Sequence, residues 1–282
     1  MAAPEEERLI YGHRKYAALH LMQSRLIHLA VREKTNYVYV TLGGTEFRDV
    51  QSLLFIDPRL ASRVISLETD KTRHQLASKT AAELRARGIP LTLFNKSFFD
   101  YERTDELPHI FFLDLEGICA WGDYYEKFGQ MFQDETIREG DILLITSYLG
   151  RDPGIKEIME TFSGEYAVLN IITEDEARRV YRRSHPSFTL YKALNHKGLT
   201  QELRIRCLGC IKYNDRSPMG VYGYSILEGS TDFRQLVNGS EIQYYDMNEV
   251  RCCAAADWAV SVRAAKRTRK SPSSQLRSKQ EL

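Results

Sequence analysis

The feature that most constrains the fold of this chain is a repeated alternation of short apolar segments with segments of helical periodicity. Five short runs have the length and the β-branched and aromatic content of buried strands: 37–42, 63–68, 89–95, 109–115 and 141–149. Helical segments are expected between most of them, over 46–56, 70–88 and 123–137. Because strands alternating with helices form right-handed parallel crossovers, this order predicts a doubly wound α/β sheet.

The second half of the chain predicts a different pattern. Residues 155–200 are polar and helical in character, with a helix breaker at His185-Pro186. Two extended segments, 203–213 and 219–228, flank Asn-Asp-Arg-Ser-Pro and predict an antiparallel hairpin with a five-residue loop. The expected architecture is therefore a mostly parallel sheet closed by an antiparallel hairpin. After it, residues 231–250 are expected to be irregular and 251–263 can form a last helix.

The chain divides into three parts on these grounds. An N-terminal segment, 1–35, contains an amphipathic helix over 14–32. The α/β domain spans 36–262 and carries a helical insertion near 155–200. The C-terminal segment, 263–282, is nearly free of apolar residues and is expected to be a disordered basic tail.

Charge is concentrated in that tail. It holds seven Lys or Arg and one Glu, so it carries +6, and the whole chain carries +1, so the remaining 262 residues carry −5. A basic tail can bind nucleic-acid phosphates without sequence specificity, or it can simply be a solvated terminus, and both alternatives stay open. The body alone gives no charge argument for nucleic acid.

The five cysteines, an odd number, and the acidic N-terminus without a long apolar region predict reduced thiols and a cytoplasmic location. No run of 18 apolar residues occurs, so no membrane span is expected. Cys207-Leu-Gly-Cys210, together with Cys252 and Cys253, offers four thiols for zinc. Residues 207 and 210 of a regular strand point to opposite faces, so we expect small buried side chains here and no metal site.

Five parallel strands followed by a hairpin resemble the class I S-adenosylmethionine-dependent methyltransferases, over about residues 36–228. The resemblance implies S-adenosylmethionine as cofactor, bound at the carboxyl ends of the first four strands, and methyl transfer to an acceptor of unassigned class. After the first strand, Gly43 and Gly44 form a Gly-rich turn, followed by Glu46. In the family this turn admits the methionine end of the cofactor, because glycine has no Cβ to block it. This chain has two adjacent glycines where the family has G-x-G-x-G, and a plain strand-to-helix turn is the alternative.

The next two candidate positions follow the second and third strands. Glu68 matches the acidic residue that accepts both ribose hydroxyls in the resemblance, and nearby Asp70 is expected to cap the following helix. Ser97 and Phe98 match the positions that frame the adenine. The alternative for Phe98 and its neighbour Phe99 is that they pack in the core beneath a loop.

Asp114, at the end of the fourth strand, is the candidate catalytic residue. The resemblance places it facing the donor methyl and the substrate, and Glu116 can share its face. The segment Asp-Leu-Glu-Gly differs from the [DNS]-P-P-[YFW] motif of the adenine and cytosine amino-methyltransferases. A run of aromatics (Trp121, Tyr124, Tyr125 and Phe128) follows, either to stack on a flat acceptor or as the core-facing stripe of a helix.

Two other classes of function stay in view. The reduced glycine motif is compatible with a catalytically inactive Rossmann-like module that binds nucleic acid or a partner protein. A dinucleotide oxidoreductase is the third alternative, against which the closing hairpin argues mildly. The absence of G-x-S-x-G and of G-x-x-x-x-G-K-[ST] gives no support to an α/β-hydrolase or a P-loop ATPase.

Overall fold

The computed structural model describes residues 26–27, 30–31, 35–42, 44–115, 124–148, 155–195, 202–215 and 217–239. The chain divides into two compact units, Met1–Tyr244 and Tyr245–Leu282, and every described residue lies in the first. The strands are β1 (Val38–Leu42), β2 (Arg63–Leu67), β3 (Leu91–Phe94), β4 (His109–Asp114), β5 (Ile142–Tyr148), β6 (Leu203–Asp215) and β7 (Ser217–Glu228). The helices are α2 (Arg48–Ile56), α3 (Lys71–Ala86), α4 (Tyr124–Gln133), α5 (Ile155–Thr161), α6 (Ser163–Leu169), α7 (Glu174–Leu194) and α8 (Phe233–Gly239), with 3₁₀ turns η2 (Pro58–Ala61) and η3 (Phe98–Asp100).

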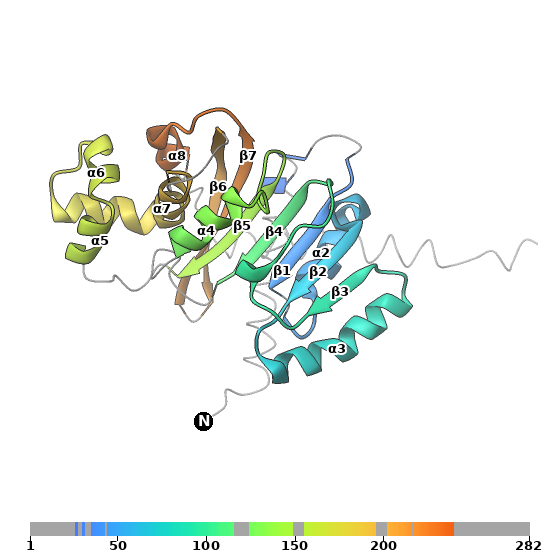
Figure 1. The fold of residues 1–282 in the computed structure, drawn as a ribbon. Coiled ribbons are helices and arrows are strands. Elements are labelled where there is room, and N and C mark those ends of the chain that lie inside the picture. The colour runs from blue at the N-terminus through green and yellow to red at the C-terminus, as the bar shows by residue number, and fades with distance from the viewer. Residues whose placement is uncertain are drawn as a thin grey trace, which may run out of the picture. The chain divides into compact units, whose positions relative to one another are not determined.

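The strands form one seven-stranded sheet in the order β3-β2-β1-β4-β5-β7-β6 (Figure 1). Strands β1 to β5 are parallel to one another, whereas β7 is antiparallel to both β5 and β6. This confirms the predicted fold class, a doubly wound and mostly parallel sheet closed by an antiparallel hairpin. The strand order reverses between β1 and β4, and in such sheets this switch point is where ligands bind, outside the carboxyl ends of the strands.

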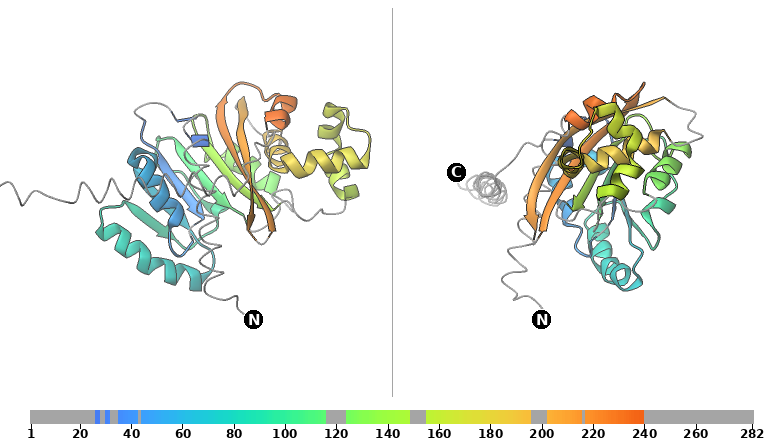
Figure 2. Two further views of the ribbon diagram at one scale, coloured as in Figure 1. Left: turned by 180° about the vertical axis from the view of Figure 1, so that it is seen from behind. Right: turned by 90° about the vertical axis from the view of Figure 1, so that its left-hand side faces the viewer.

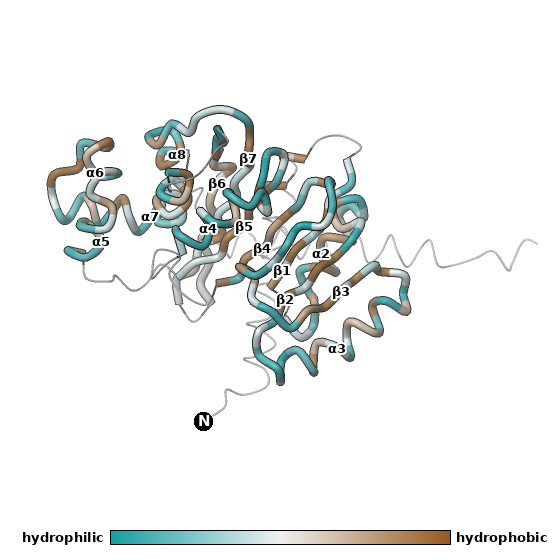
Figure 3. Tube along the Cα trace, in the orientation of Figure 1, coloured by the Kyte–Doolittle hydropathy of each residue, from teal (hydrophilic) through white to brown (hydrophobic). Residues whose placement is uncertain are grey.

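Helices cover both faces of the sheet, as the alternation of side chains in β1 illustrates. Val38 and Val40 belong to a core that includes Phe128 and Phe132 of α4. Tyr39 and Thr41 point to the opposite face, where α2 packs. The views from the front and from behind place α4 and α2 on opposite faces (Figures 1 and 2). The central strands are predominantly hydrophobic along their length, as a sheet buried on both faces requires (Figure 3).

The predicted strands and helices of the first half are confirmed to within four residues at each end. The predicted break at His185-Pro186 is also confirmed, because Ser184 has non-helical backbone angles inside α7. The first predicted helix and the possible last helix lie almost wholly outside the described residues.

Two predictions for the second half are wrong. The hairpin has no five-residue loop, because its pairing continues through Asn214–Pro218 to Asp215–Ser217. The segment expected to be irregular contains α8. Its start is capped by Asp232, which accepts from the amides of Arg234 and Gln235, and the Phe233 ring packs edge-on against Phe188 with centroids 5.0 Å apart. A local cap and tertiary burial thus outweigh the polar composition.

A pair of glycines shapes the hairpin on the α2 side of the sheet. Gly209 and Gly223 lie opposite each other, and the Leu26 side chain packs over both. A Cβ on Gly223 would lie 3.1 Å from Leu26 Cδ1 and 3.3 Å from Leu26 Cβ. The absence of side chains at this pair therefore makes room for an N-terminal residue that is only 5% exposed.

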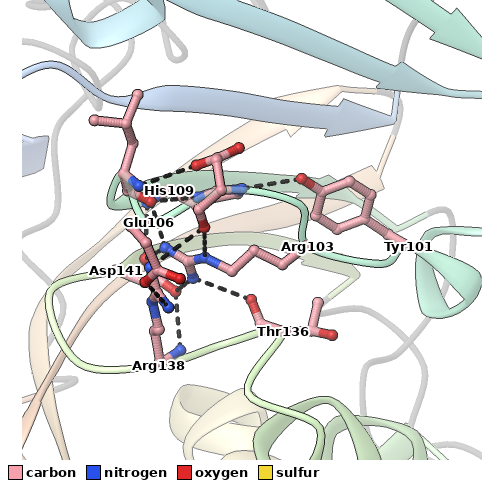
Figure 4. A network of polar contacts seen from close by, with 9 residues as sticks. Tyr101, Arg103, Glu106, His109, Thr136, Arg138 and Asp141 are labelled. Carbon is pink, nitrogen blue, oxygen red and sulfur yellow. Dashed lines mark hydrogen bonds and ion pairs between the residues drawn. The ribbon is translucent and has the colours of Figure 1, made fainter.

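At the amino edge of the sheet, the buried Asp141 carboxylate joins the start of β4 to the start of β5 (Figure 4). Its Oδ1 accepts from the His109 amide at 2.7 Å and its Oδ2 from the Arg138 amide at 2.9 Å. The Arg103 guanidinium donates to both oxygens, at 3.2 and 2.7 Å. Burial raises the pKa of Asp141, while the hydrogen bonds and the charge of Arg103 oppose that rise.

His109 is enclosed in the same network as a neutral ring. Its Nδ1 lies 2.8 Å from the Leu107 carbonyl oxygen and therefore carries the hydrogen, so Nε2 accepts from the Tyr101 hydroxyl at 2.9 Å. Burial, and after it the positive charge of Arg103, lower the pKa of His109 from 6.5 to about 4. Burial is also the main cause that raises the pKa of Tyr101 to about 12, so the hydroxyl keeps its hydrogen.

Among the helices of the described ranges, none combines the length and the apolar character that crossing a bilayer would require.

Replacing Gly223 with alanine is expected to lower the free energy of unfolding by about 1–3 kcal/mol, because the new methyl group overlaps Leu26. The measurement is urea denaturation followed by circular dichroism. Gly164→Ala is the matched control, because no atom lies within 4 Å of a Cβ at that position. Equal stability of Gly223→Ala and the wild type would contradict the packing of Leu26 over this strand pair.

The low pKa of His109 predicts a specific pH dependence of stability. Between pH 6.5 and about 4 the unfolded histidine binds a proton that the folded one does not, so stability decreases as the pH falls through this window. This contribution amounts to at most about 1.4 kcal/mol per pH unit. Urea midpoints at several pH values should show a shallower decrease for His109→Gln than for the wild type. His74→Gln, on α3 away from this network, should retain the wild-type dependence, and parallel curves for all three proteins would refute the assignment.

Candidate functional site

The candidate site is the carboxyl edge of the parallel strands, where the sequence places most of its candidate residues. Glu68 follows β2, Ser97 follows β3, Asp114 ends β4 and the Gly43-Gly44 turn follows β1. Because these four strands are parallel neighbours, their carboxyl ends share one edge of the sheet. The structure therefore brings the predicted elements together around the switch point between β1 and β4.

In the turn after β1, the described candidate residues Gly44 and Glu46 are exposed. Gly43 and Glu116 lie outside the described residues. Gly44 is exposed, and among the described residues that are not its chain neighbours no atom lies within 4 Å of a Cβ placed at this position. The Glu46 carboxylate is also exposed and forms an ion pair with Arg48. Neither Gly44 nor Glu46 is therefore part of the packed core.

A carboxyl group that the sequence analysis missed lies beneath this turn. Asp49, in the first turn of α2, is buried against β1 and accepts from Tyr39 Oη at 2.9 Å and from Thr41 Oγ1 at 2.7 Å. The backbone amides of Asp49 and Val50 also donate to it. Burial raises the pKa of Asp49, and these four hydrogen bonds oppose the rise. In the sequence, Asp49 is an acid followed by apolar Val50 and Leu53. Because an ordinary helix start has the same pattern, the sequence does not mark Asp49 as a buried residue.

Glu68 is held at the carboxyl end of β2 by its own neighbours. Its Oε1 accepts from the Asp70 amide at 2.9 Å, and its carbonyl oxygen accepts from Asn95 Nδ2 at 2.7 Å. Within the described part of the chain, Oε2 makes no hydrogen bond. Asp70 caps α3 as predicted, with Oδ1 accepting from the Arg73 amide at 2.8 Å. Glu68 is thus a half-buried carboxylate that is oriented at one oxygen and available at the other.

The two residues expected at the adenine have different environments. Ser97 is half-buried and caps η3, with Oγ accepting from the Phe99 amide at 3.2 Å. Phe98 is only 3% exposed and packs edge-on against Phe111, with centroids 5.7 Å apart. Phe98 therefore packs in the core, which was the alternative to a position beside the adenine, and Phe99 is the ring nearer the surface.

Asp114 ends β4 in a half-buried position. Its Oδ1 accepts from Thr146 Oγ1 at 2.7 Å, across the parallel pairing of β4 with β5. Thr146 is fully buried, so this contact fixes one side of the carboxylate. Asp114 is therefore an oriented acid beside the switch point.

One residue further along β5, a buried serine meets a histidine from the kink of α7. Ser147 Oγ lies 2.5 Å from His185 Nε2, and the His185 ring contacts Tyr181 and Tyr222. Both side chains of the pair are at most 2% exposed. This pair joins α7 to the end of β5 and is closed to ligands.

The aromatic run after β4 divides between core and surface. Trp121 lies outside the described residues, and Phe128 is fully buried in the core. Tyr124 and Tyr125 are half-buried in the first turn of α4. The helical stripe that the spacing predicts is thus present, and its N-terminal rings reach the surface.

The expectation that Cys207 and Cys210 point to opposite faces is wrong. A β-bulge between Cys207 and Gly209 inserts one residue, so Cys207 lies opposite Tyr224 and Cys210 opposite Tyr222. Tyr222 and Tyr224 are two residues apart, so both thiols lie on one face of the hairpin. Across the residues that the structure describes, no group of three or more His, Cys, Asp or Glu side chains could hold a metal ion.

No family model and no curated protein matches this chain. Solved structures with a similar fold include the plantazolicin methyltransferase BpumL in complex with SAH, with a TM-score of 0.44 at 9% identity, covering 77% of this chain and 86% of that one. An S-adenosylmethionine-dependent methyltransferase from Clostridium acetobutylicum matches with a TM-score of 0.43 at 9% identity, covering 76% and 92%. An rRNA methylase from Streptococcus thermophilus matches with a TM-score of 0.40 at 15% identity, covering 74% and 97%.

The sequence pattern predicted a mostly parallel sheet closed by an antiparallel hairpin, and the structure adds the strand order, with an antiparallel β7 between β5 and β6. The chain therefore has a Rossmann-like α/β fold, a doubly wound and mostly parallel sheet closed by an antiparallel hairpin.

Proposed function

We propose that this protein binds S-adenosylmethionine at the carboxyl edge of β1 to β4 and transfers its methyl group to an acceptor. The observation that carries the proposal is Glu68. Its Oε1 is fixed by the Asp70 amide, and its Oε2 makes no hydrogen bond within the described residues. A carboxylate at the end of the second strand accepts ribose hydroxyls in nucleotide-binding sheets of this type.

The remaining roles follow from position along the same edge. Gly43 and Gly44, with Glu46 beside them, line the methionine end, where the open space next to Gly44 leaves room for a ligand. In this proposal, Ser97 and the start of η3 lie near the adenine. The buried ring of Phe98, the first residue of η3, packs in the core and holds η3 in place. Asp114 orients the acceptor or the amino group of the donor.

Asp49 argues for S-adenosylmethionine over a dinucleotide. A dinucleotide places its pyrophosphate on free amides at the start of the helix that follows the first strand. In this chain, the amides of Asp49 and Val50 in that helical turn donate to the Asp49 carboxyl group. A phosphate would have to displace this internal acceptor, whereas S-adenosylmethionine carries no phosphate.

When bound, S-adenosylmethionine supplies a methyl group on a positively charged sulfur. The protein contributes mainly by holding the acceptor in line with that group, which is catalysis by positioning. Asp114 suits this task because the Thr146 hydroxyl fixes its Oδ1 across the β4–β5 pair.

Glu68→Ala is expected to abolish binding of S-adenosylmethionine and to leave the fold intact, because the side chain is only half-buried and makes one hydrogen bond through its carboxylate. Isothermal titration calorimetry measures the affinity, and circular dichroism checks the fold. Glu83→Ala, at an exposed position of α3, is the matched control and should bind as the wild type does. An unchanged affinity in Glu68→Ala would remove the main support for the proposal.

A panel of ligands tests the class of cofactor directly. S-adenosylmethionine and S-adenosylhomocysteine should raise the melting temperature, since a ligand at 100 times its Kd adds about 2.7 kcal/mol to stability. NAD⁺ and ATP at the same concentration should not, because Asp49 already occupies the amides at the start of α2. A shift with NAD⁺ and none with S-adenosylhomocysteine would overturn the assignment of the cofactor.

A further inference from the structure

Three aromatic rings and two lysines lie at the end of β3, in and just before η3, and in the first turn of α4. We call this set the lysine–aromatic strip, and it consists of Phe94, Lys96, Phe99, Tyr124 and Lys127. Lys96 Nζ lies 5.4 Å from the centroid of the Phe94 ring, and Lys127 Nζ lies 5.5 Å from Phe99 and 5.9 Å from Tyr124. The Phe99 and Tyr124 centroids are 5.6 Å apart, so the second half of the strip is continuous.

The strip is accessible from solvent. Phe94 is 41% exposed, an unusual exposure for a large ring at a strand end, and Lys127 is exposed. The other three residues are half-buried. Lys96 forms no ion pair with any carboxylate among the described residues, so its charge is available to a ligand.

The strip adjoins the candidate site. Phe94 is the last residue of β3, and Asn95 donates to the carbonyl oxygen of Glu68 at 2.7 Å. Lys96 directly precedes Ser97, and α4 is the helix that connects β4 to β5. A ligand that follows the strip therefore passes the carboxyl edge at which we place the cofactor.

We propose that the lysine–aromatic strip binds a single strand of nucleic acid. Surfaces that hold single strands combine aromatic rings, on which bases stack, with cations that follow the phosphates. The strip supplies both aromatic rings and lysines. The C-terminal residues 263–282 add a formal charge of +6 to the same chain, which favours a polyanionic partner over a neutral one.

This inference rests on the proposed function in one respect: with methyl transfer at the adjacent edge, the bound strand would present the methyl acceptor. Binding of the strand itself needs no cofactor. The two proposals therefore fail independently, and a protein without affinity for S-adenosylmethionine could still bind the strand.

The test is fluorescence anisotropy with the full-length protein and no cofactor. The probes are a labelled single-stranded RNA of about 12 nucleotides, the single-stranded DNA of the same sequence and the corresponding duplex. Phe94→Ala is expected to weaken single-strand binding by about five- to 100-fold, the usual effect of removing one stacking ring. Lys127→Gln should lower the slope of log K against log salt by about 0.7, the loss of one phosphate contact. Comparison of the RNA and DNA arms identifies the natural partner.

Two variants on the exposed face of α3 serve as matched controls. Leu76→Ala removes an apolar side chain that is 52% exposed, and Lys79→Gln removes an exposed charge. Both should bind the strand as the wild type does. Wild-type affinity in Phe94→Ala and Lys127→Gln would overturn the proposal, since the basic C-terminal segment would then account for binding. Absence of single-strand binding, or preference for the duplex, would overturn it as well.

Discussion

The hydrogen bonds around Asp141 set the register of the two central strands, and much of the molecule depends on that register. One carboxylate receives the amide at the start of β4, the amide of Arg138 and both arms of the Arg103 guanidinium. With the amino ends fixed, Ile110 pairs with Ile142, and four residues later Asp114 pairs with Thr146. A slip by one residue would turn each side chain of a strand to the other face. The geometry of Asp114 at one edge is thus determined at the opposite edge.

The sequence was sufficient to predict the sheet because its strands are buried on both faces. Apolar runs such as 109–115 and 141–149 are too short for helices, and the helical segments between them leave parallel crossovers as the simplest connection. The positions of Glu68, Ser97 and Asp114 at one edge followed from that topology alone. Even the kink in α7 was visible, since proline cannot continue a regular helix.

What the sequence did not reveal depends on contacts between distant residues. The bonds from Tyr39 and Thr41 to Asp49 require the return of α2 onto β1, and those from Arg103 to Asp141 span 38 residues. The sequence left Phe98 either beside the adenine or in the core, and its edge-on packing against Phe111 depends on a residue of another strand. The bulge in β6 changes the phase of the strand by one residue, so simple alternation placed Cys207 and Cys210 on the wrong faces.

The carboxyl group of Asp49 has a consequence for how this fold selects among nucleotides. In the structure, the Asp49 carboxyl group accepts from two amides in the first turn of α2, so a phosphate at these two amides would have to compete with it. This competition would disfavour phosphorylated cofactors independently of the contacts that favour the correct cofactor. A single aspartate, buried for the sake of packing α2 on β1, would in this way exclude a whole chemical class of ligands.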